Sequence, residues 1–474
     1  MKTTGTTLFL AMTVAILPQP ATLEVRPGYF QSSRPLRTLN DLGRKLRLTS
    51  RDANPALGPE GYELTVTTDR VTICASGPAG IFYGQQTLRQ LLPGPIPCVH
   101  IEDRPRFQWR GALLDVARHF FPKEFLKRYI DLLAFHKLNV LQLHLTDDQG
   151  WRVQIQRYPK LTRVGSRRAE TCGDAQRYGG YYTQTELRDL VAYAAARQIT
   201  IVPEIEMPGH SLAALAAYPE FSCTGGPFRV RTTWGIERDV FCAGNEKTFE
   251  FLQNVLDEVM AIFPSPFIHI GGDECPKDRW KVCPKCQARI KAEGLQDERE
   301  LQSYFIRRIE KHLTARGRRL IGWSEIREGG LAPNAAVMDW KGGAVEAATA
   351  GHDVVMSPTT HCYLDYYQSQ EKTAEPKAIG GFLPLSKVYS FEPIPSKLAP
   401  EFHRHILGAQ ANLWTEYISS PQHAEYMAFP RLCALAEVVW SPAEKRDWAD
   451  FSARLTRHLK RLDALRVNYR RPTP

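Results

Sequence analysis

The sequence between residues 267 and 274 is Phe267-Ile268-His269-Ile270-Gly271-Gly272-Asp273-Glu274. A short apolar run ends here in two glycines and two adjacent carboxylates. The pattern predicts a buried parallel strand that carries both acids at its C-terminal tip, with glycines that let a ligand approach the backbone closely. Paired carboxylates favour acid–base chemistry on a bond that needs no redox cofactor. The alternative is structural, a strand followed by a helix whose first turn favours acidic residues.

Similar apolar runs recur from Arg110 onward and alternate with helical stretches. There are eight of them: Gly111–Val116, Asn139–Leu145, Ile199–Glu204, Phe267–Ile270, Leu320–Trp323, Ala336–Met338, Val354–Met356 and Ile406–Ala409. The amphipathic segments between them include Lys123–Phe135, Thr185–Arg197 and Glu246–Ile262. Eight strand–helix repeats predict an α/β fold, a (β/α)8 TIM barrel, with a doubly wound open sheet as the alternative.

A small α+β domain is expected before the barrel. Residues 62–66 and 70–73 alternate like strands, residues 80–92 carry apolar side chains at helical spacing, and Pro93-Gly94-Pro95 ends that helix. We therefore expect a signal peptide at 1–16, a small α+β N-terminal domain at 17–103 and a catalytic barrel at 104–474.

Composition excludes several classes of protein. The 474 residues are 43% hydrophobic and 24% charged, which is typical of a soluble globular chain with room for more than one domain. The net charge is +10, but acids are interleaved with the basic residues and no nucleic-acid motif is present, so we expect no nucleic-acid partner. The apolar run at residues 8–17 is too short to span a bilayer and resembles a signal peptide, or alternatively a first β-strand. We expect a secreted or periplasmic protein without a membrane span.

The ten cysteines raise two expectations. Cys223 and Cys242 flank a glycine-rich loop, which a disulfide between them would close. Cys283-Pro284-Lys285-Cys286, with Cys275 upstream, has the form of a metal clip or redox pair. A zinc site needs a second pair of ligands at suitable spacing, and the sequence near this motif offers none. We therefore expect local disulfides or free thiols here, and no metal.

Acids and aromatic residues follow every predicted barrel strand, at the end where barrel enzymes hold their active sites. Carboxylates with one arginine and several tryptophans suit a neutral polyhydroxylated ring, because carboxylates accept from hydroxyls and indole faces stack on sugar faces. No His-Glu-x-x-His motif occurs, so no metal or organic cofactor is expected, and the histidines of the strand ends are expected to be structural. The strand-end residues are Asp115, Arg118, His119, His144, Asp147, Asp148, Trp151, Glu204, Glu206, His210, His269, Asp273, Glu274, Trp323, Glu325, Asp339, Trp340, Tyr363, Asp365, Trp414 and Glu416.

These motifs resemble glycoside hydrolase family 20, the β-N-acetylhexosaminidases. The resemblance begins with His269–Glu274 and covers nearly the whole chain, including the small N-terminal domain. The other motifs that carry it are Arg110–Phe120, Lys137–Arg152, Pro203–His210, Gly322–Glu325, Asp339-Trp340, Tyr363–Asp365 and Asn412–Glu416.

The resemblance implies a mechanism without a protein nucleophile. Glu274 would protonate the glycosidic oxygen and then activate water. Asp273 would orient the 2-acetamido group of the substrate, whose oxygen attacks the sugar to give an oxazolinium intermediate and net retention. Two close negative charges raise one another's pKa, which is expected to keep Glu274 protonated before the first step.

The resemblance also implies roles for the surrounding side chains. Arg118, Asp365 and Glu416 would bind sugar hydroxyls, and Tyr363 would donate to the acetamido carbonyl. Asp147 and His210 would tune Glu274, with Asp148 as a residue that could exchange roles with Asp147. Glu206 stands where relatives often carry aspartate, which leaves its role open. The pocket walls would be Trp323, Trp340 and Trp414.

The expected activity is removal of non-reducing terminal β-linked N-acetylglucosamine or N-acetylgalactosamine from chitin fragments or glycans. Three alternatives stay open: release of a disaccharide, a catalytically silent sugar-binding barrel, and a metal-dependent hydrolase. The partner is in each case a glycan, and the sequence does not give the oligomeric state.

Overall fold

The computed structural model describes residues 14–471, which form two compact units. The first unit comprises residues up to Pro105 together with Trp440–Arg466, and the second comprises Arg106–Val439 with the residues from Val467 onward. The expected division placed 104–474 in one domain, whereas the structure groups residues 440–466 with the N-terminal strands. Residues 1–13 of the predicted signal peptide lie outside the described residues, and Ile16 is buried.

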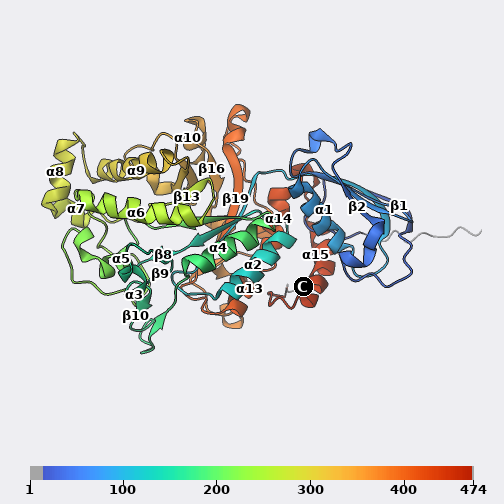
Figure 1. Cartoon of the computed structure of the whole chain (residues 1–474), viewed down its shortest axis with the longest axis horizontal. Coiled ribbons are helices and arrows are strands. Elements are labelled where there is room, and N and C mark those ends of the chain that lie inside the picture. The colour runs from blue at the N-terminus through green and yellow to red at the C-terminus, as the bar shows by residue number, and fades with distance from the viewer. Residues whose placement is uncertain (1–13, 472–474) are drawn as a thin grey trace, which may run out of the picture. The chain divides into compact units, whose positions relative to one another are not determined.

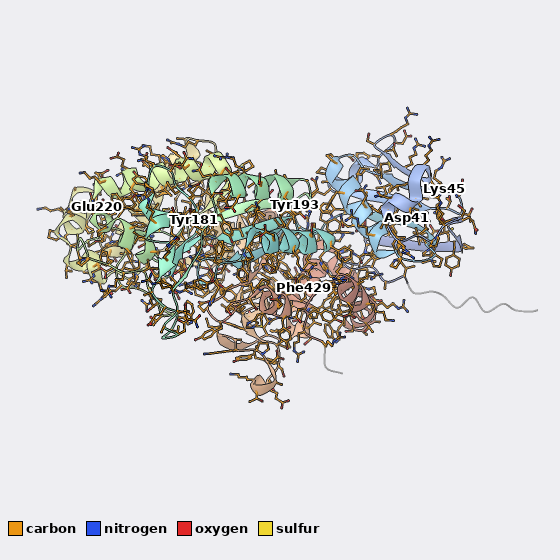
Figure 2. The ribbon with its side chains drawn as sticks, turned by 60° about the horizontal axis from the view of Figure 1, so that its bottom comes forward. Asp41, Lys45, Tyr181, Tyr193, Glu220 and Phe429 are labelled. Atoms are coloured by element: carbon orange, nitrogen blue, oxygen red, sulfur yellow. The ribbon has the colours of Figure 1, made fainter. Side chains whose placement is uncertain are left out.

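The first unit is built on a five-stranded sheet in the order β1-β5-β3-β4-β2. Alternate residues of β3 are buried, so the sheet has one face in the core, where α1 packs against β3 and β4. The strands and helix expected at 62–66, 70–73 and 80–92 are present as β3, β4 and α1. The elements are β1 (Thr22–Tyr29), η1 (Leu39–Lys45), β2 (Leu46–Thr49), η2 (Pro55–Leu57), β3 (Tyr62–Val66), β4 (Val71–Cys74), α1 (Pro78–Gln90), β5 (Pro97–Asp103), η7 (Ala443–Lys445) and α15 (Trp448–Ala464). Figure 2 labels Asp41 and Lys45 on η1.

The C-terminal part of this unit is fixed by a buried carboxylate. The indole Nε1 of Trp440 donates to both oxygens of Asp103, at 3.0 and 3.1 Å, and the Tyr62 hydroxyl donates to the same carboxylate at 2.6 Å. A buried carboxylate is costly unless such donors surround it. This contact explains why residues 440–466 group with the first unit.

The second unit is a closed barrel of eight parallel strands in the order β6-β7-β12-β13-β14-β15-β16-β19. Each predicted apolar run is one of these strands, which confirms the (β/α)8 barrel and rules out the open sheet. The ring closes where β19 pairs with β6, from Gly408 opposite Trp109 to Leu413 opposite Leu114. The strands are β6 (Trp109–Asp115), β7 (Val140–His144), β12 (Thr200–Glu204), β13 (Phe267–His269), β14 (Arg319–Trp323), β15 (Ala336–Asp339), β16 (Val354–Met356) and β19 (Ile406–Leu413).

Helices cover the outside of the barrel strands (Figure 1). Thr183 and Glu186 form a capping box that starts α4, and the side chain of Asn245 accepts from Lys247 to start α6. The longer helices are α2 (Lys123–Phe135), α4 (Gln184–Ala195), α6 (Glu246–Ile262), α8 (Pro284–Ala292), α9 (Glu298–Thr314), α13 (Pro421–Ala428) and α14 (Arg431–Trp440). The shorter helices are α3 (Lys160–Arg163), α5 (Leu212–Ala217), η3 (Pro219–Phe221), α7 (Asp278–Val282), η4 (Ser324–Arg327), α10 (Ala344–Thr349), α11 (Thr359–Cys362), η5 (Lys372–Ala374), α12 (Leu385–Tyr389) and η6 (Pro400–His405).

Short strand pairs occur in the loops, between β8 (Thr146–Asp147) and β9 (Gly150–Trp151), β10 (Arg167–Arg168) and β11 (Tyr178–Gly179), and β17 (Tyr366–Tyr367) and β18 (Gly380–Phe382). Neighbouring outer helices are also linked through side chains. Tyr193 of α4, labelled in Figure 2, donates its hydroxyl to Asp131 of α2 at 2.8 Å. Among residues 14–471, the longest helices are too short or too polar to cross a bilayer.

The barrel depends on a glycine at its closing strand pair. Gly408 has φ +146°, and a Cβ there would overlap the carbonyl of Trp109. Gly351 also has a positive φ, +89°, but a Cβ there would have no neighbour within 4 Å. A side chain at Gly408 is therefore disfavoured by both backbone conformation and steric overlap. A side chain at Gly351 is disfavoured by backbone conformation alone.

We predict that Gly408→Ala lowers the free energy of unfolding by about 2–4 kcal/mol, because the left-handed strain is joined by overlap with a backbone that cannot move freely. Gly351→Ala is the matched control and should cost only about 1 kcal/mol. Thermal unfolding of both variants measures the difference. Equal midpoints would show that the barrel closure tolerates a methyl group here.

Candidate active site

The two predicted catalytic acids lie in the turn that follows β13. Gly271 and Gly272 adopt φ values of +65° and +91°, and a Cβ on Gly271 would overlap the carboxyl group of Glu206. The glycines were expected to make room for a ligand. Instead, the structure shows that they allow a left-handed turn and make room for the buried side chain of Glu206, from the loop after the neighbouring strand β12.

Asp273, Glu274 and His210 converge at this turn. One polar atom of each lies within 4.8 Å of the others, and His210 Nε2 is 3.5 Å from Glu274 Oε2 and 3.8 Å from Asp273 Oδ2. His210 and Glu274 have φ values of +46° and +45°. Non-glycine residues in this region are strained, and such strain is concentrated at functional sites. The Asp273 side chain is 14% exposed and that of Glu274 38%, so both face a partly open space.

A buried network centred on Asp147 supports these acids. Asp147 Oδ2 accepts from Arg118 Nη2 at 2.8 Å and from His144 Nε2 at 2.8 Å, while its Oδ1 lies 3.4 Å from His210 Nδ1. On its other side, His144 Nδ1 is 2.7 Å from Glu204 Oε2. The network joins the ends of β6, β7 and β12 to the histidine that contacts Glu274. The predicted grouping of Asp147 and His210 near Glu274 is therefore present.

Charge decides the protonation of this network. Burial opposes ionisation of Asp147, but Arg118, His210 and His144 hold its pKa well below the usual range. Burial alone would lower the pKa of His144, but Glu204 and Asp147 raise it to about 10. The pKa of His210 is likewise raised well above its usual value, against its burial, chiefly by Asp147. The raised pKa values favour protonated imidazoles, which balance the negative charge of Asp147.

The two catalytic acids have opposite pKa shifts. Burial, together with the carboxylates of Glu325, Glu204 and Glu274, raises the pKa of Asp273 to about 7, although His210 acts against this. A hydrogen bond from His210 lowers the pKa of Glu274, although burial opposes it. The expectation that the neighbouring charge keeps Glu274 protonated is therefore wrong for the unliganded protein. The reason is His210, which was expected to tune Glu274 and whose raised pKa favours the cationic form that donates to it.

Glu206 is a buried acid beside this network. Its burial and the charges of Asp273 and Glu204 raise its pKa well above the usual value. Neither of its carboxyl oxygens has a hydrogen-bond partner among the described residues. The raised pKa favours the neutral form of Glu206, whose carboxyl group fills the space beside Gly271.

Aromatic residues wall the space beside the acids. The Trp414 ring lies 5.6 Å from Trp323 and 6.5 Å from Tyr363, and Trp340 stacks on Tyr363 at 6.2 Å between ring centroids. Arg118 lies 5.2 Å above the Trp414 ring. Trp323 is only 1% exposed and donates to Glu204 at 2.8 Å, so it lies behind Trp414 and supports it.

Two further predicted residues present unpaired acceptors. Asp365 Oδ1 and Glu416 Oε2 are buried without a hydrogen-bond partner in the described part of the chain, and the same holds for Asp273 Oδ1. Burial and the neighbouring Glu416 raise the pKa of Asp365 well above its usual value, and burial raises that of Glu416 although Arg118 opposes it. Buried acceptors are nearly always satisfied, so these atoms are suited to donors from a bound molecule.

Three strand-end residues to which the sequence assigned no role also belong to the site. Asp115 accepts from the backbone of Arg118 at 3.0 Å, Glu325 accepts from Trp340 Nε1 at 2.9 Å, and Glu204 holds His144 and Trp323. All three lie at the ends of barrel strands. That position was the one signal in the sequence that placed them near the site.

We predict that Asp147→Asn lowers the free energy of unfolding by about 3 kcal/mol, because Arg118 and His144 then lose their buried counter-charge. The matched control is Asp189→Asn, since the ion pair of Asp189 with Lys123 is at the surface and contributes little. Thermal or urea unfolding of the two variants tests this. Equal stability would show that the network is held by packing instead of charge.

Comparison with known proteins gives the family of this chain. Residues 107–443 match the model of glycosyl hydrolase family 20, catalytic domain, and residues 32–104 match domain 2 of the same family. A beta-hexosaminidase of Porphyromonas gingivalis is 50% identical over 433 residues, which cover 88% of this chain and 55% of that relative. This chain therefore spans little more than half the length of that protein.

Two crystal structures share the fold. A β-N-acetylhexosaminidase superposes with a TM-score of 0.88 at 36% identity, covering 97% of both chains. The exo-β-N-acetylglucosaminidase of Vibrio harveyi in complex with N-acetylglucosamine gives a TM-score of 0.87 at 35% identity, covering 97% of this chain and 79% of that one. The chain belongs to glycosyl hydrolase family 20.

Proposed function

We propose that this protein is a retaining exo-β-N-acetylhexosaminidase that uses the acetamido group of its substrate as the nucleophile. The observation that carries the proposal is the pair Asp273–Glu274, two adjacent carboxylates whose surroundings shift their pKa values in opposite directions. Such a separation is how one site supplies both an acid and an ionised carboxylate at one pH. If neither carboxyl group carried a proton, the pair could not protonate the leaving group.

Substrate binding is proposed to move the shared proton. The acetamido N–H donates to Asp273, which favours the ionised form of Asp273. The sugar also covers Glu274, which is 38% exposed in the free protein, and this desolvation favours its protonated form. The bound substrate therefore converts the resting arrangement into the reactive one.

In the first step the acetamido carbonyl oxygen forms a bond to the anomeric carbon, and the glycosidic C–O bond breaks. The leaving oxygen keeps the electron pair and takes the proton of Glu274, while Asp273 stabilises the positive oxazolinium. Tyr363 donates its hydroxyl to the acetamido oxygen and positions it. In the second step Glu274 takes a proton from water as the water attacks the anomeric carbon. The acetamide is restored and the β-configuration is retained.

Recognition of the sugar is assigned to the unpaired acceptors and the aromatic wall. Asp365 and Glu416 accept from hydroxyls, Arg118 donates to others, and Trp414 and Trp340 stack on the apolar faces of the sugar. A neutral polyhydroxylated ring suits this set, because its hydroxyls can donate to the unpaired carboxyl oxygens and its apolar faces can stack on the indoles. The Vibrio harveyi neighbour binds N-acetylglucosamine, which supports the same sugar class for this chain.

The decisive experiment compares aryl β-glycosides with and without the 2-acetamido group. Turnover is expected only with the acetamido group, because the plain hexoside has no internal nucleophile. The product from the acetamido substrate should appear first as the β-anomer in a time-resolved NMR spectrum. Comparable turnover of both glycosides, or an α-product, would overturn the mechanism.

We predict that the acid pair behaves differently in two isosteric variants. Glu274→Gln should lose most activity on a disaccharide but retain more on an activated aryl glycoside, which needs no protonation. Asp273→Asn should lose turnover on both, by about 10²–10³-fold, since the acetamido group is no longer held for attack. Glu346→Gln, at an exposed position of α10, is the control. Full activity of Glu274→Gln on both substrates would contradict its role as the acid.

The pKa shifts predict a pH profile for kcat/KM on a disaccharide. The free protein holds one proton on the pair up to a pH of about 7, the pKa of Asp273, and loses it above. Activity should therefore fall as pH rises through this value, because the pair then has no proton to deliver. In Asp273→Asn the fall should move to lower pH, where Glu274 alone titrates. If the pH profile of Asp273→Asn did not shift, another group would control the fall in activity.

The finer specificity and the location of the protein are also proposals. We propose release of a single N-acetylglucosamine or N-acetylgalactosamine from chitin fragments or glycans, and export through the apolar N-terminal segment, most of which lies outside the described residues. Products from a tetrasaccharide would separate single-sugar release from disaccharide release. Binding without hydrolysis of any N-acetylhexosaminide would instead indicate a silent sugar-binding barrel.

A further inference from the structure

Four cysteines from three segments of the second unit meet away from the acids. Their sulfur atoms all lie within 4.8 Å of one another. Cys242 Sγ is 3.6 Å from Cys286 Sγ and 3.8 Å from Cys283 Sγ, and Cys223 Sγ is 3.8 Å from Cys286 Sγ. Cys242, Cys283 and Cys286 are buried, and Cys223 is half-buried. The second pair of ligands, which the sequence near the Cys283–Cys286 motif did not offer, is supplied by Cys242 and Cys223, 41 and 63 positions from their partners Cys283 and Cys286.

The sulfur distances fit a tetrahedral metal centre. Four sulfurs each bound at a Zn–S distance of about 2.3 Å form a tetrahedron with edges of about 3.8 Å. A disulfide would instead bring two sulfurs to about 2.05 Å. All four cysteines are unbonded in the structure, which corrects the expectation of a Cys223–Cys242 disulfide.

The backbone around the cluster is built to hold the sulfurs. A bridge between Ser222 and Phe241, with a hydrogen bond from Cys242 N to Phe221 O at 2.8 Å, places Cys223 beside Cys242. Gly244 packs so closely on the backbone of residues 285 and 286 that a Cβ would overlap it. The Gly244 N–H also donates to the Cys242 sulfur. Only glycine permits this approach of the two segments.

Four sulfurs in mutual contact call for a cation. As thiolates they would repel one another at these distances. A divalent cation among them removes this repulsion and allows all four sulfurs to ionise.

We propose that Cys223, Cys242, Cys283 and Cys286 bind one structural Zn²⁺ ion. Four protein ligands close the coordination sphere, so the ion has no open position for a substrate or water. A tetrahedral thiolate site takes either zinc or iron. We commit to zinc, because the hydrolysis proposed for this chain has no step that a redox-active ion would serve. On binding, thiol protons pass to solvent and no electrons are transferred.

The site would fix the loops that carry the catalytic machinery. Cys283 and Cys286 flank the start of α8, soon after Asp273 and Glu274, whereas Cys223 and Cys242 belong to the β12–α6 connection, which also carries His210. Figure 1 shows α5, α7 and α8 grouped at one end of this unit, and Figure 2 labels Glu220, in the η3 helix just before Cys223, at that end. Trp280 Nε1 joins the two connections directly, by donating to Phe241 O at 2.9 Å. Zinc would therefore keep the loop that carries His210 in a fixed position relative to the turn that carries Glu274.

The first test is metal analysis of the full-length protein after purification without added metal or chelator. One zinc per chain is expected by mass spectrometry of the elements. Cys242→Ser and Cys286→Ser should each reduce this to less than about 0.2 zinc per chain, since three ligands bind far more weakly. Cys172→Ser, at an exposed cysteine outside the cluster, is the matched control and should retain full zinc. Zinc-free protein with ten titratable thiols, or iron in place of zinc, would overturn the proposal.

A second test avoids variants that fail to fold. The unaltered protein is titrated with a mercurial thiol reagent, and released zinc is followed with a metal-binding dye. One zinc should be released as four thiols react. Cobalt exchanged into the protein should give the intense visible bands of a tetrahedral cobalt–thiolate centre. Release without thiol reaction, or octahedral cobalt bands, would place the metal elsewhere. Both readouts are independent of hydrolysis, so they stand even if the proposed reaction fails.

Discussion

The structure of the site depends on one buried carboxylate, Asp147, and on the cations that surround it. An isolated charge at this depth would be strongly unfavourable, and Arg118, His144 and His210 provide the compensation. Those three residues lie at the ends of three different strands or in the loops that follow them, so one charge balance fixes three strand ends at once. His210 then transmits the arrangement to Glu274, whose pKa it lowers.

This dependence also explains the protonation of the catalytic pair. Asp273 is more buried and lies among carboxylates, while Glu274 is more exposed and contacts a cationic histidine. The proton therefore rests on Asp273 when the protein is free. A sugar that donates to one acid and shields the other from water reverses that preference, so in our proposal recognition of the acetamido group and activation of the acid are a single event.

Most of the fold could be predicted from the sequence, because the signals that mark its strands and helices are local. Each barrel strand is a short apolar run, and α2 and α6 have the predicted bounds because their apolar spacing and flanking residues mark them. The C-terminal helix α15 was predicted to belong to the barrel domain. The contact that groups it with the first unit joins Trp440 to Asp103, which are 337 positions apart, so no local signal in the sequence marks it. The four-cysteine cluster was not predicted for the same reason. Cys223 and Cys242 are distant in sequence from Cys283 and Cys286 and meet them only when the loops fold. The pKa order of the acids was missed because it depends on where His210 points.

The pairing of β19 with β6 has a consequence for how the chain is made. The first and last strands of the barrel are neighbours, yet almost 300 residues separate Gly408 from Trp109. While the ribosome is still synthesising the region before residue 406, the β6 edge has no partner, and an unpaired strand edge invites association with other chains. The nascent protein must therefore keep this edge protected until its last strand has emerged, and a version shortened before Ile406 would be expected to aggregate.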